Sequence, residues 1–400
     1  MTCNGKKIGI IIGCLNLGGA EKVAALLSGQ LTERGYTVYL FIDRHCGGTA
    51  YRYKGKIVWI SSAETGNRER DLKYRAFYLK NLKKELGIDV SISFMEPYNF
   101  ANILSDIGER KILSVRTSLS MRRPEWPKLD DIYKKQIPRL YNKAYRITTM
   151  TKYQADDLIR NYGVDKKKIR IIPNMTDETA SADGNTRKLN IKLPPHSIVN
   201  IGRLTDVKAQ WQLIRAMHDV VKSVSDAQVF FLGNGENLTC LENLSKALKL
   251  TDNIHFEGFT SSVKDYLMQA DILVHVSKAE GFVNALLDAF TCGTPVICTD
   301  VPASARDLTA PGADIEEKIN YPWYAEYGVL VPAPDNNKTN TDINLTEGEK
   351  ALAEAMIRLL TDNDMREHYR KKSIQRSEAF KPEKVVPQWI DLIENQDLNL

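Results

Sequence analysis

The stretch KAEGFVNALLDAF, residues 278–290, decides how the second half of the chain is interpreted. Its apolar residues recur at helical spacing, yet two acids, Glu280 and Asp288, bracket the run, and Gly281 follows the first of them. A buried helix needs neither acid. Asn284 and Asp288 are four residues apart and so share one face of a helix. The stretch therefore predicts a strand end, a sharp turn at the glycine, and a helix that presents polar groups to a ligand.

Short apolar strands alternate with amphipathic helices on both sides of this stretch. The expected strands are 8–14, 37–42, 89–94, 111–115 and 146–150 in the first half, then 197–201, 227–232, 254–257, 272–276 and 295–299. Continuous apolar strands separated by helices favour a parallel sheet that is covered on both faces. The fold class expected is therefore α/β, with two doubly wound sheets.

Four hundred residues exceed what one hydrophobic core usually serves. A polar segment at 177–188 interrupts the alternation and is the expected linker. We expect an N-terminal Rossmann-like domain at 1–176, a second at 177–379, and a C-terminal helix at 380–400 that packs back toward the first domain. The segment 300–327 is predicted to be irregular and rich in aromatic residues.

The composition, 43% hydrophobic and 26% charged, is that of an ordinary globular chain. No apolar run approaches the ~20 residues of a membrane span, and the N-terminus lacks the pattern of a signal peptide. The six cysteines are scattered, without metal-ligand spacing, so neither a disulfide framework nor a zinc site is expected. A cytoplasmic location with reduced thiols is predicted.

Charge is distributed unevenly along the chain. Residues 1–175 hold 32 Lys and Arg against 17 Asp and Glu, which leaves the remainder net acidic. The stretches 73–84 and 121–128 mix cations with aromatic residues, which favours contact with an anionic membrane surface or a polyprenyl diphosphate acceptor. A merely solvated basic face is the alternative. Nucleic acid is disfavoured because no nucleic-acid motif accompanies the charge. The cations expected to contact acceptor or membrane are Lys80, Lys83, Lys84, Arg122 and Arg123.

Two further motifs follow predicted strands. Gly18 and Gly19 lie at the start of a helix, where backbone amides favour anions. In the second half, Gly202 precedes Arg203, and Lys208 follows five residues later; two such cations at a strand end suit a diphosphate. A tight turn without a ligand and ordinary surface cations are the alternatives.

Two other features have structural interpretations. The sequence Asp362-Asn363-Asp364 spells an acidic pair, but it lies between two predicted helices, where a helix-capping Asp is expected. His275 lies within an apolar strand and is interpreted as a hydrogen-bonded core histidine. No metal site is predicted.

The spacing of Glu280 and Asp288, with seven residues between them, and the following CGTPVICTD at 292–300 resemble the Ex7E signature of retaining glycosyltransferases of family 4. The loop 18–21 and the stretch 202–208 occur in the family's order, so the resemblance covers nearly the whole chain. It implies the GT-B fold, in which two Rossmann-like domains face each other across a cleft.

The resemblance implies a role for each motif. Glu280, Arg203 and Lys208 would be catalytic. The donor nucleotide sugar would contact Gly18, Gly19, Gly202, Arg203, Lys208, Glu280, Gly281, Phe282, Val283, Asn284 and Asp288. Two positions depart from the family: Asp288 is one methylene shorter than the Glu expected to bind the ribose, and 114–117 lacks the family's histidine.

The predicted function is transfer, with retention, of a hexose or N-acetylhexosamine from a nucleotide-diphosphate sugar, UDP-sugar first, to a glycan or lipid-linked acceptor. No cofactor and no metal ion are expected, and the protein is predicted to bind the cytoplasmic face of the membrane peripherally. The alternative is a catalytically silent GT-B subunit that binds a nucleotide sugar or a partner transferase.

Overall fold

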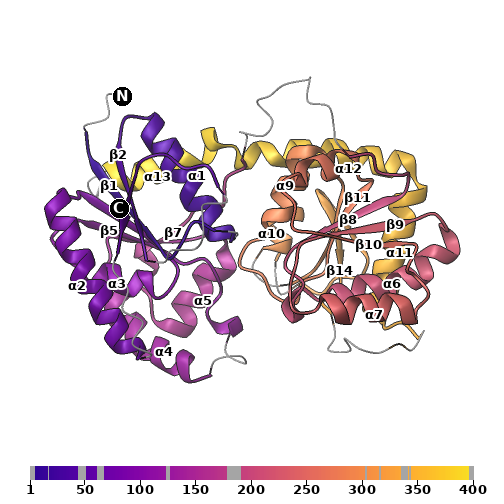
Figure 1. The fold of residues 1–400 in the computed structure, drawn as a ribbon, viewed down its shortest axis with the longest axis horizontal. Coiled ribbons are helices and arrows are strands. Elements are labelled where there is room, and N and C mark those ends of the chain that lie inside the picture. Colours follow the sequence, from indigo (N-terminus) through magenta and orange to yellow (C-terminus); the bar gives the residue numbers. More distant parts are fainter. Residues whose placement is uncertain are drawn as a thin grey trace. The chain divides into compact units, whose positions relative to one another are not determined.

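The computed structural model describes residues 5–16, 18–43, 51–60, 67–122, 127–177, 191–301, 304–314, 317–334, 341 and 344–395. The chain divides into two compact units. The first comprises Met1–Met175 and Pro382–Leu400, and the second comprises Thr176–Lys381 (Figure 1). Most of the predicted linker, 177–188, lies outside the described residues.

The first unit is built on a seven-stranded parallel sheet in the order β3-β2-β1-β4-β5-β6-β7. Its strands are β1 (Lys7–Ile12), β2 (Thr37–Ile42), β3 (Lys56–Trp59), β4 (Val90–Phe94), β5 (Arg110–Ser114), β6 (Arg146–Thr149) and β7 (Ile169–Ile171). Its helices are α1 (Gly19–Glu33), α2 (Arg68–Leu86), α3 (Tyr98–Leu104), α4 (Pro127–Tyr141), α5 (Lys152–Tyr162) and α13 (Pro382–Glu394).

The central strands of this sheet are the ones that the sequence predicts. All five residues of β4 are buried, as are five of the six in β1, because helices cover both faces of the sheet. The edge strands β3 and β7 were not predicted. Each has exposed positions and is too short to give a continuous apolar run. Their existence depends on pairing with β2 and β6, which a local pattern does not reveal.

The C-terminal helix α13 belongs to the first unit, where Figure 1 shows it in yellow beside the indigo strands. Trp389 is 1% exposed and packs 6.2 Å, ring to ring, from Phe94 of β4. At the end of the helix, Arg110 donates to the carbonyl oxygens of Leu392 and Ile393 at 3.1 and 2.8 Å. Apolar burial along the helix and cations at its C-terminus thus fix α13 to the sheet.

The second unit repeats the architecture, with the strand order β10-β9-β8-β11-β12-β14-β13. Its strands are β8 (Ser197–Ile201), β9 (Gln228–Leu232), β10 (Ile254–Gly258), β11 (Ile272–His275), β12 (Val296–Thr299), β13 (Trp323–Ala325) and β14 (Gly328–Val331). Its helices are α6 (Gln210–Ser223), α7 (Leu238–Ala247), α8 (Val263–Gln269), α9 (Asn284–Cys292), α10 (Ala305–Thr309), α11 (Glu347–Thr361) and α12 (Asn363–Ser377).

The segment 300–327 is more ordered than the sequence predicts. It contains α10, and β13 pairs antiparallel with β14 at the edge of the sheet. Arg306 of α10 binds both carboxylate oxygens of Asp300, and Tyr321 donates to the same carboxylate at 2.6 Å. The composition of the segment, rich in turn formers, does not indicate that Arg306 and Tyr321 both bind Asp300.

The prediction of two doubly wound parallel-sheet units is confirmed. The chain passes from one unit to the other at 175/176 and at 381/382. The boundaries predicted from the sequence are 176/177 and 379/380. Within the described residues, no helix has both the length and the apolar composition needed to cross a membrane.

The contact of α13 with the first sheet predicts a large stability effect. Trp389→Ala should lower the free energy of unfolding of the first unit by about 3–5 kcal/mol, because it opens a cavity in a closed core. Phe77→Ala is the matched control, since that ring is 61% exposed. Urea unfolding followed by circular dichroism measures both. Equal, small effects would show that α13 is not fixed in this core.

Candidate functional site

The candidate site lies at the carboxyl edge of the second unit's sheet, where ligands of doubly wound sheets are usually bound. The loop after β8 carries Arg203 and Lys208, and the loop after β11 carries Glu280. The two loops are joined by a backbone hydrogen bond of 2.8 Å from the amide of Lys278 to the carbonyl of Val207. Two motifs that are more than seventy residues apart therefore meet at one place.

Glu280 is the centre of a hydrogen-bonded cluster. Its Oε1 accepts from Nζ of Lys208, from Oγ of Ser277 at 2.6 Å, and lies 2.8 Å from Nε2 of His275. Ser277 Oγ and His275 Nε2 are themselves 2.9 Å apart. The second oxygen, Oε2, takes no part in these contacts. The cluster orients one carboxylate rigidly at the strand ends.

The electrostatics of the cluster keep this carboxylate ionised. The Glu280 side chain is 11% exposed and that of Lys208 is 22% exposed. Burial alone would raise the pKa of Glu280, but the positive charge of Lys208 and the bond to His275 outweigh it, so the pKa lies well below its usual range. A carboxylate of this kind is a weak proton acceptor and a strong hydrogen-bond acceptor.

The loop after β8 gives the backbone access to a ligand. Gly202 has φ of +155°, a conformation that other residues rarely adopt. The backbone that follows is held by Gln210, whose Nε2 donates to the carbonyl of Arg203 at 2.9 Å. The Arg203 side chain is exposed. The same loop thus carries an exposed guanidinium, that of Arg203, and an ammonium, that of Lys208, which is held by Glu280.

Helix α9 begins at Asn284, as the sequence predicts. Phe282 and Val283 are 8% and 2% exposed, so only their backbone groups are placed to meet a ligand. Asn284 and Asp288 are partly exposed and lie on one face of the helix. Gly281 lies in the turn between this helix and Glu280.

Gly18 and Gly19 lie in the first unit, at the start of α1. The side chain of Glu21 folds back over Gly18 so closely that a Cβ there would lie 1.9 Å from Oε2. A larger residue at this position would displace the Glu21 carboxylate from the first turn of α1. The Glu21 side chain therefore packs against the backbone at the start of α1.

The prediction that Lys83 contacts the acceptor or the membrane is wrong. Lys83 is fully buried, because it continues the inward stripe of Ala76 and Leu79 on α2. Its Nζ lies 2.6 Å from Glu109 Oε1, and burial lowers its pKa to about 8 although Glu109 opposes this. Lys83 therefore ties α2 to the end of α3 and to the loop before β5, and it cannot meet a membrane or an acceptor.

Of the other four cations predicted to contact acceptor or membrane, the structure describes the side chains of two. Lys80 and Lys84 are exposed on α2. Arg122 ends a short 3₁₀ turn, Ser120–Arg122, but its side chain is outside the described part of the chain, as is the whole of Arg123.

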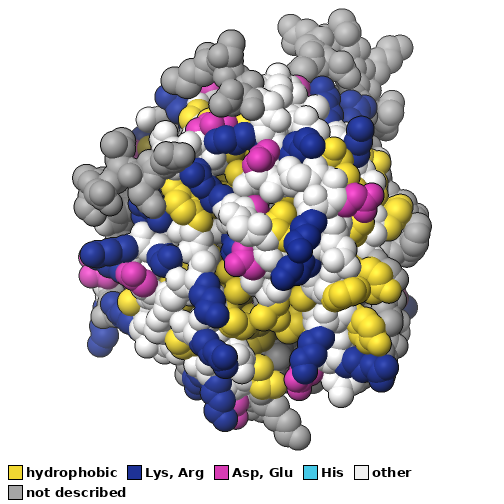
Figure 2. Space-filling model, turned by 90° about the vertical axis from the view of Figure 1, so that its left-hand side faces the viewer, with side chains coloured by type: hydrophobic (Ala, Val, Ile, Leu, Met, Phe, Trp, Pro, Cys, Tyr) yellow, Lys and Arg dark blue, Asp and Glu magenta, His cyan; other side chains and the backbone are white. Residues whose placement is uncertain are grey.

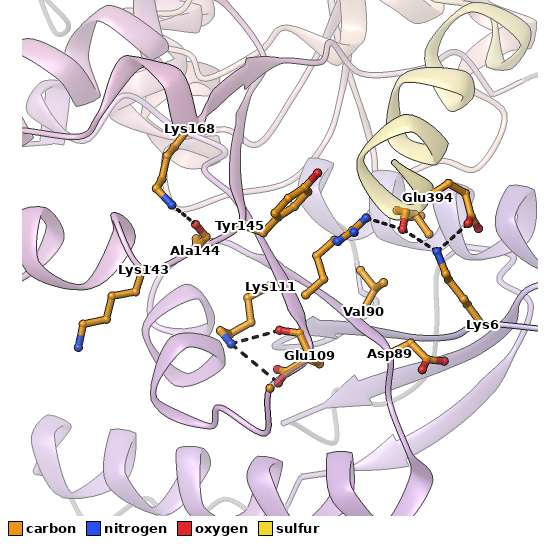
Figure 3. A pocket seen from close by; sticks show the side chains of 13 residues that line it. Lys6, Asp89, Val90, Glu109, Lys111, Lys143, Ala144, Tyr145, Lys168 and Glu394 are labelled. Carbon is orange, nitrogen blue, oxygen red and sulfur yellow. Dashed lines mark hydrogen bonds and ion pairs between the residues drawn. The ribbon is translucent and has the colours of Figure 1, made fainter. Parts of the chain in front are cut away.

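A cavity of about 630 Å³ lies at the amino edge of the first unit's sheet, opposite to the edge where ligands are expected (Figure 3). Lys6 there donates to Glu394 at 2.6 Å and to the carbonyl of Ile393 at 3.1 Å, and Lys168 donates to the carbonyl of Ala144 at 2.7 Å. Lys6 is thus engaged in holding the end of α13, and Lys168 is engaged by the loop before β6. The cavity is thus a structural junction and not the candidate site.

Sequence reasoning missed two members of the site. His275 is buried and hydrogen-bonded, as predicted, but its partner is the candidate catalytic carboxylate. Ser277 is buried beside it. Their position at the end of β11, just before Glu280, is the signal that could have identified them. Asp362 caps α12 by accepting from the amide of Met365 at 2.9 Å, so the capping interpretation is confirmed. Within the described residues, no three His, Cys, Asp or Glu side chains gather as a metal site.

Comparison with known proteins agrees with this geometry. Residues 17–180 match the family described as Glycosyltransferase Family 4, and residues 182–316 match Glycosyl transferases group 1. An uncharacterised glycosyltransferase of Methanocaldococcus jannaschii is 30% identical over 277 residues, which are 66% of this chain and 68% of that protein.

A second relative covers almost the whole length. The N-acetylgalactosamine-N,N'-diacetylbacillosaminyl-diphospho-undecaprenol 4-alpha-N-acetylgalactosaminyltransferase of Campylobacter jejuni is 26% identical over 389 residues, 95% of this chain and 97% of that protein. Sucrose-phosphate synthase of Thermosynechococcus elongatus shares the GT-B fold, with a TM-score of 0.76 at 17% identity over 97% and 98% of the two chains. The chain therefore belongs to the glycosyltransferases, with a family 4 N-terminal part and a group 1 C-terminal part.

Proposed function

We propose that this glycosyltransferase moves a hexose or N-acetylhexosamine, with retention, from a UDP-sugar to a glycan or lipid-linked saccharide. The observation that carries the proposal is the cluster of Lys208, His275, Ser277 and Glu280 at the carboxyl edge of the second sheet. The cluster offers a carboxylate, which can accept hydrogen bonds from sugar hydroxyls, beside a cation, which can bind a diphosphate.

The donor would be bound through distinct groups. Lys208 and Arg203 would neutralise the diphosphate, together with the N-terminal end of α9. Glu280 would accept from hydroxyls of the transferred sugar, since its Oε2 has no hydrogen bond within the cluster. Asp288, one turn beyond Asn284, would contact the ribose.

The reaction would need no enzymic base. The bond between the sugar C1 and the diphosphate oxygen breaks, and the acceptor oxygen forms a new bond to C1 on the same face. The acceptor proton passes to the departing phosphate oxygen. Lys208 and Arg203 meet the negative charge that grows on that phosphate, while the low pKa of Glu280 suits it to stabilise the positive sugar centre rather than to take a proton.

The acceptor is proposed from the named relative. The Campylobacter jejuni protein acts, by its name, on a saccharide joined to diphospho-undecaprenol. A lipid-linked saccharide is accordingly the acceptor that we propose for this chain, with the first unit as its binding domain.

We expect the purified protein to transfer or hydrolyse at least one UDP-sugar, and Glu280→Gln to lower kcat by about 100-fold or more, because the lost charge is needed most in the transition state. Glu354→Gln, an exposed acid on α11, is the matched control and should be unaffected. Anomeric configuration of the product by NMR tests retention. Chelation with EDTA should change nothing, since we propose a metal-independent reaction.

Full turnover by Glu280→Gln would refute the assigned role. A wild-type protein that binds UDP-sugars but neither transfers nor hydrolyses them would instead support the silent-subunit alternative.

Membrane contact is proposed for the exposed face of α2. Lys73, Lys80 and Lys84 are exposed there beside the rings of Tyr74 and Phe77, which are 36% and 61% exposed. Figure 2 shows this side of the first unit, with dark blue cations interspersed with yellow apolar side chains and fewer magenta acids. Such a face attracts anionic lipids at about 1 kcal/mol per cation. The cytoplasmic leaflet is the proposed location.

The triple variant Lys73→Gln, Lys80→Gln, Lys84→Gln should lose sedimentation with phosphatidylglycerol vesicles at low salt. The matched control removes the same charge from the second unit, with Lys222→Gln, Lys246→Gln and Lys249→Gln, and should still sediment. Binding should fall steeply as salt increases. If wild-type protein ignores the vesicles, or if both triples behave alike, α2 is not the contact surface.

A further inference from the structure

Arg116 is a buried cation at the carboxyl edge of the first sheet, two residues beyond the end of β5. It is 6% exposed. Its guanidinium donates to Oδ1 of Asn174 and, at 3.5 Å, to Oγ of Ser114, and it lies 5.6 Å above the ring of Phe94. All of these partners are neutral. Among the described residues, Nε of Arg116 has no hydrogen-bond partner.

This arrangement differs from the other buried cations of the same unit. Arg75 is paired with Asp43, and Lys83 with Glu109, each through a direct ion pair. No such pair joins Arg116 to a carboxylate of the described residues. A buried charge without an opposite charge in contact is costly, so proteins rarely retain one unless a ligand supplies the partner.

The nearest negative charge belongs to the first turn of α1. Glu21, which folds over Gly18, interacts with Arg116 through its charge but shares no hydrogen bond with it among the described residues. Burial lowers the pKa of Arg116 and Glu21 opposes this, yet a guanidinium keeps its charge at neutral pH. Arg116 therefore stands near the anion-favouring end of α1 with donors unused.

We propose that Arg116 binds a phosphate oxyanion of a substrate at the carboxyl edge of the first sheet. A guanidinium has five N–H donors, and the protein contacts given above use two of them. A phosphate oxygen would supply the missing negative charge and the missing acceptors together. This inference rests on the proposed function, in which both the UDP-sugar and the lipid-linked acceptor carry a diphosphate.

The two sources of the oxyanion can be separated with soluble probes. UDP represents the donor, and farnesyl diphosphate, at a concentration below its micelle formation, represents the acceptor. Isothermal titration calorimetry should show that Arg116→Gln binds one or both probes about 10- to 100-fold more weakly than wild type, because a hydrogen bond between charged groups is lost. Weakening of UDP alone assigns the oxyanion to the donor, and weakening of farnesyl diphosphate alone assigns it to the acceptor.

Stability distinguishes binding from a structural role. Because Arg116 has no carboxylate in contact, Arg116→Gln should melt at the same temperature as wild type or higher. Arg146→Gln is the matched control: Arg146 also donates to a neutral partner, the carbonyl of Tyr145, but at the opposite edge of the sheet, and its loss should leave probe binding unchanged. Arg116→Lys, which retains the charge without the planar fork, should bind with intermediate affinity.

The inference is overturned if Arg116→Gln melts well below wild type while Arg116→Lys binds both probes like wild type, since this is the behaviour of a structural cation. It is also overturned if wild type binds a probe and Arg116→Gln binds it equally well, an outcome that leaves the proposed function intact. If wild type binds neither probe, the proposed function fails as well.

Discussion

Lys208 and Glu280 form the ion pair that joins the loops after two strands, and the candidate site depends on it. Removal of either partner would leave the other charge partly buried without its main counterpart, which is strongly unfavourable. The pair also fixes the protonation state of the acid and holds it against His275. In the absence of substrate each charge satisfies the other. In the proposed reaction a diphosphate would share Lys208 with Glu280, while Ser277 and His275 would still hold Oε1 of that carboxylate.

The topology explains why the chemistry gathers at one edge of each sheet. All strands of the first sheet are parallel, so their carboxyl ends meet at the edge that carries Gly18 and Arg116. The amino edge has a different use. Lys6 and Arg110 bind the C-terminal end of α13 there, so the cavity of about 630 Å³ at this edge is a structural junction.

The strand and helix alternation and the position of Glu280 could be predicted from sequence because both depend on local patterns. Apolar runs mark the central strands, and an acid followed by Gly281 marks a strand-to-helix turn. The partners of charged groups could not be predicted. The helical spacing of Lys83 with Ala76 and Leu79 gives its inward direction, but not its partner Glu109, which comes from another element; likewise the sequence places His275 in the core without identifying Glu280 as its partner. Edge strands and buried ion pairs require long-range contacts, which no local spacing records.

Calorimetric binding of UDP and of a UDP-sugar to wild type, Lys208→Met and Glu280→Gln tests the central claim most directly. Lys208→Met should weaken both ligands, because both carry the diphosphate. Glu280→Gln should weaken the UDP-sugar by about 10-fold or more, equivalent to about 1.4 kcal/mol, yet leave UDP unchanged or bound more tightly, because Lys208 is freed from its partner. Equal weakening of UDP and UDP-sugar by Glu280→Gln, or no effect on either, would contradict the division of roles between these two residues.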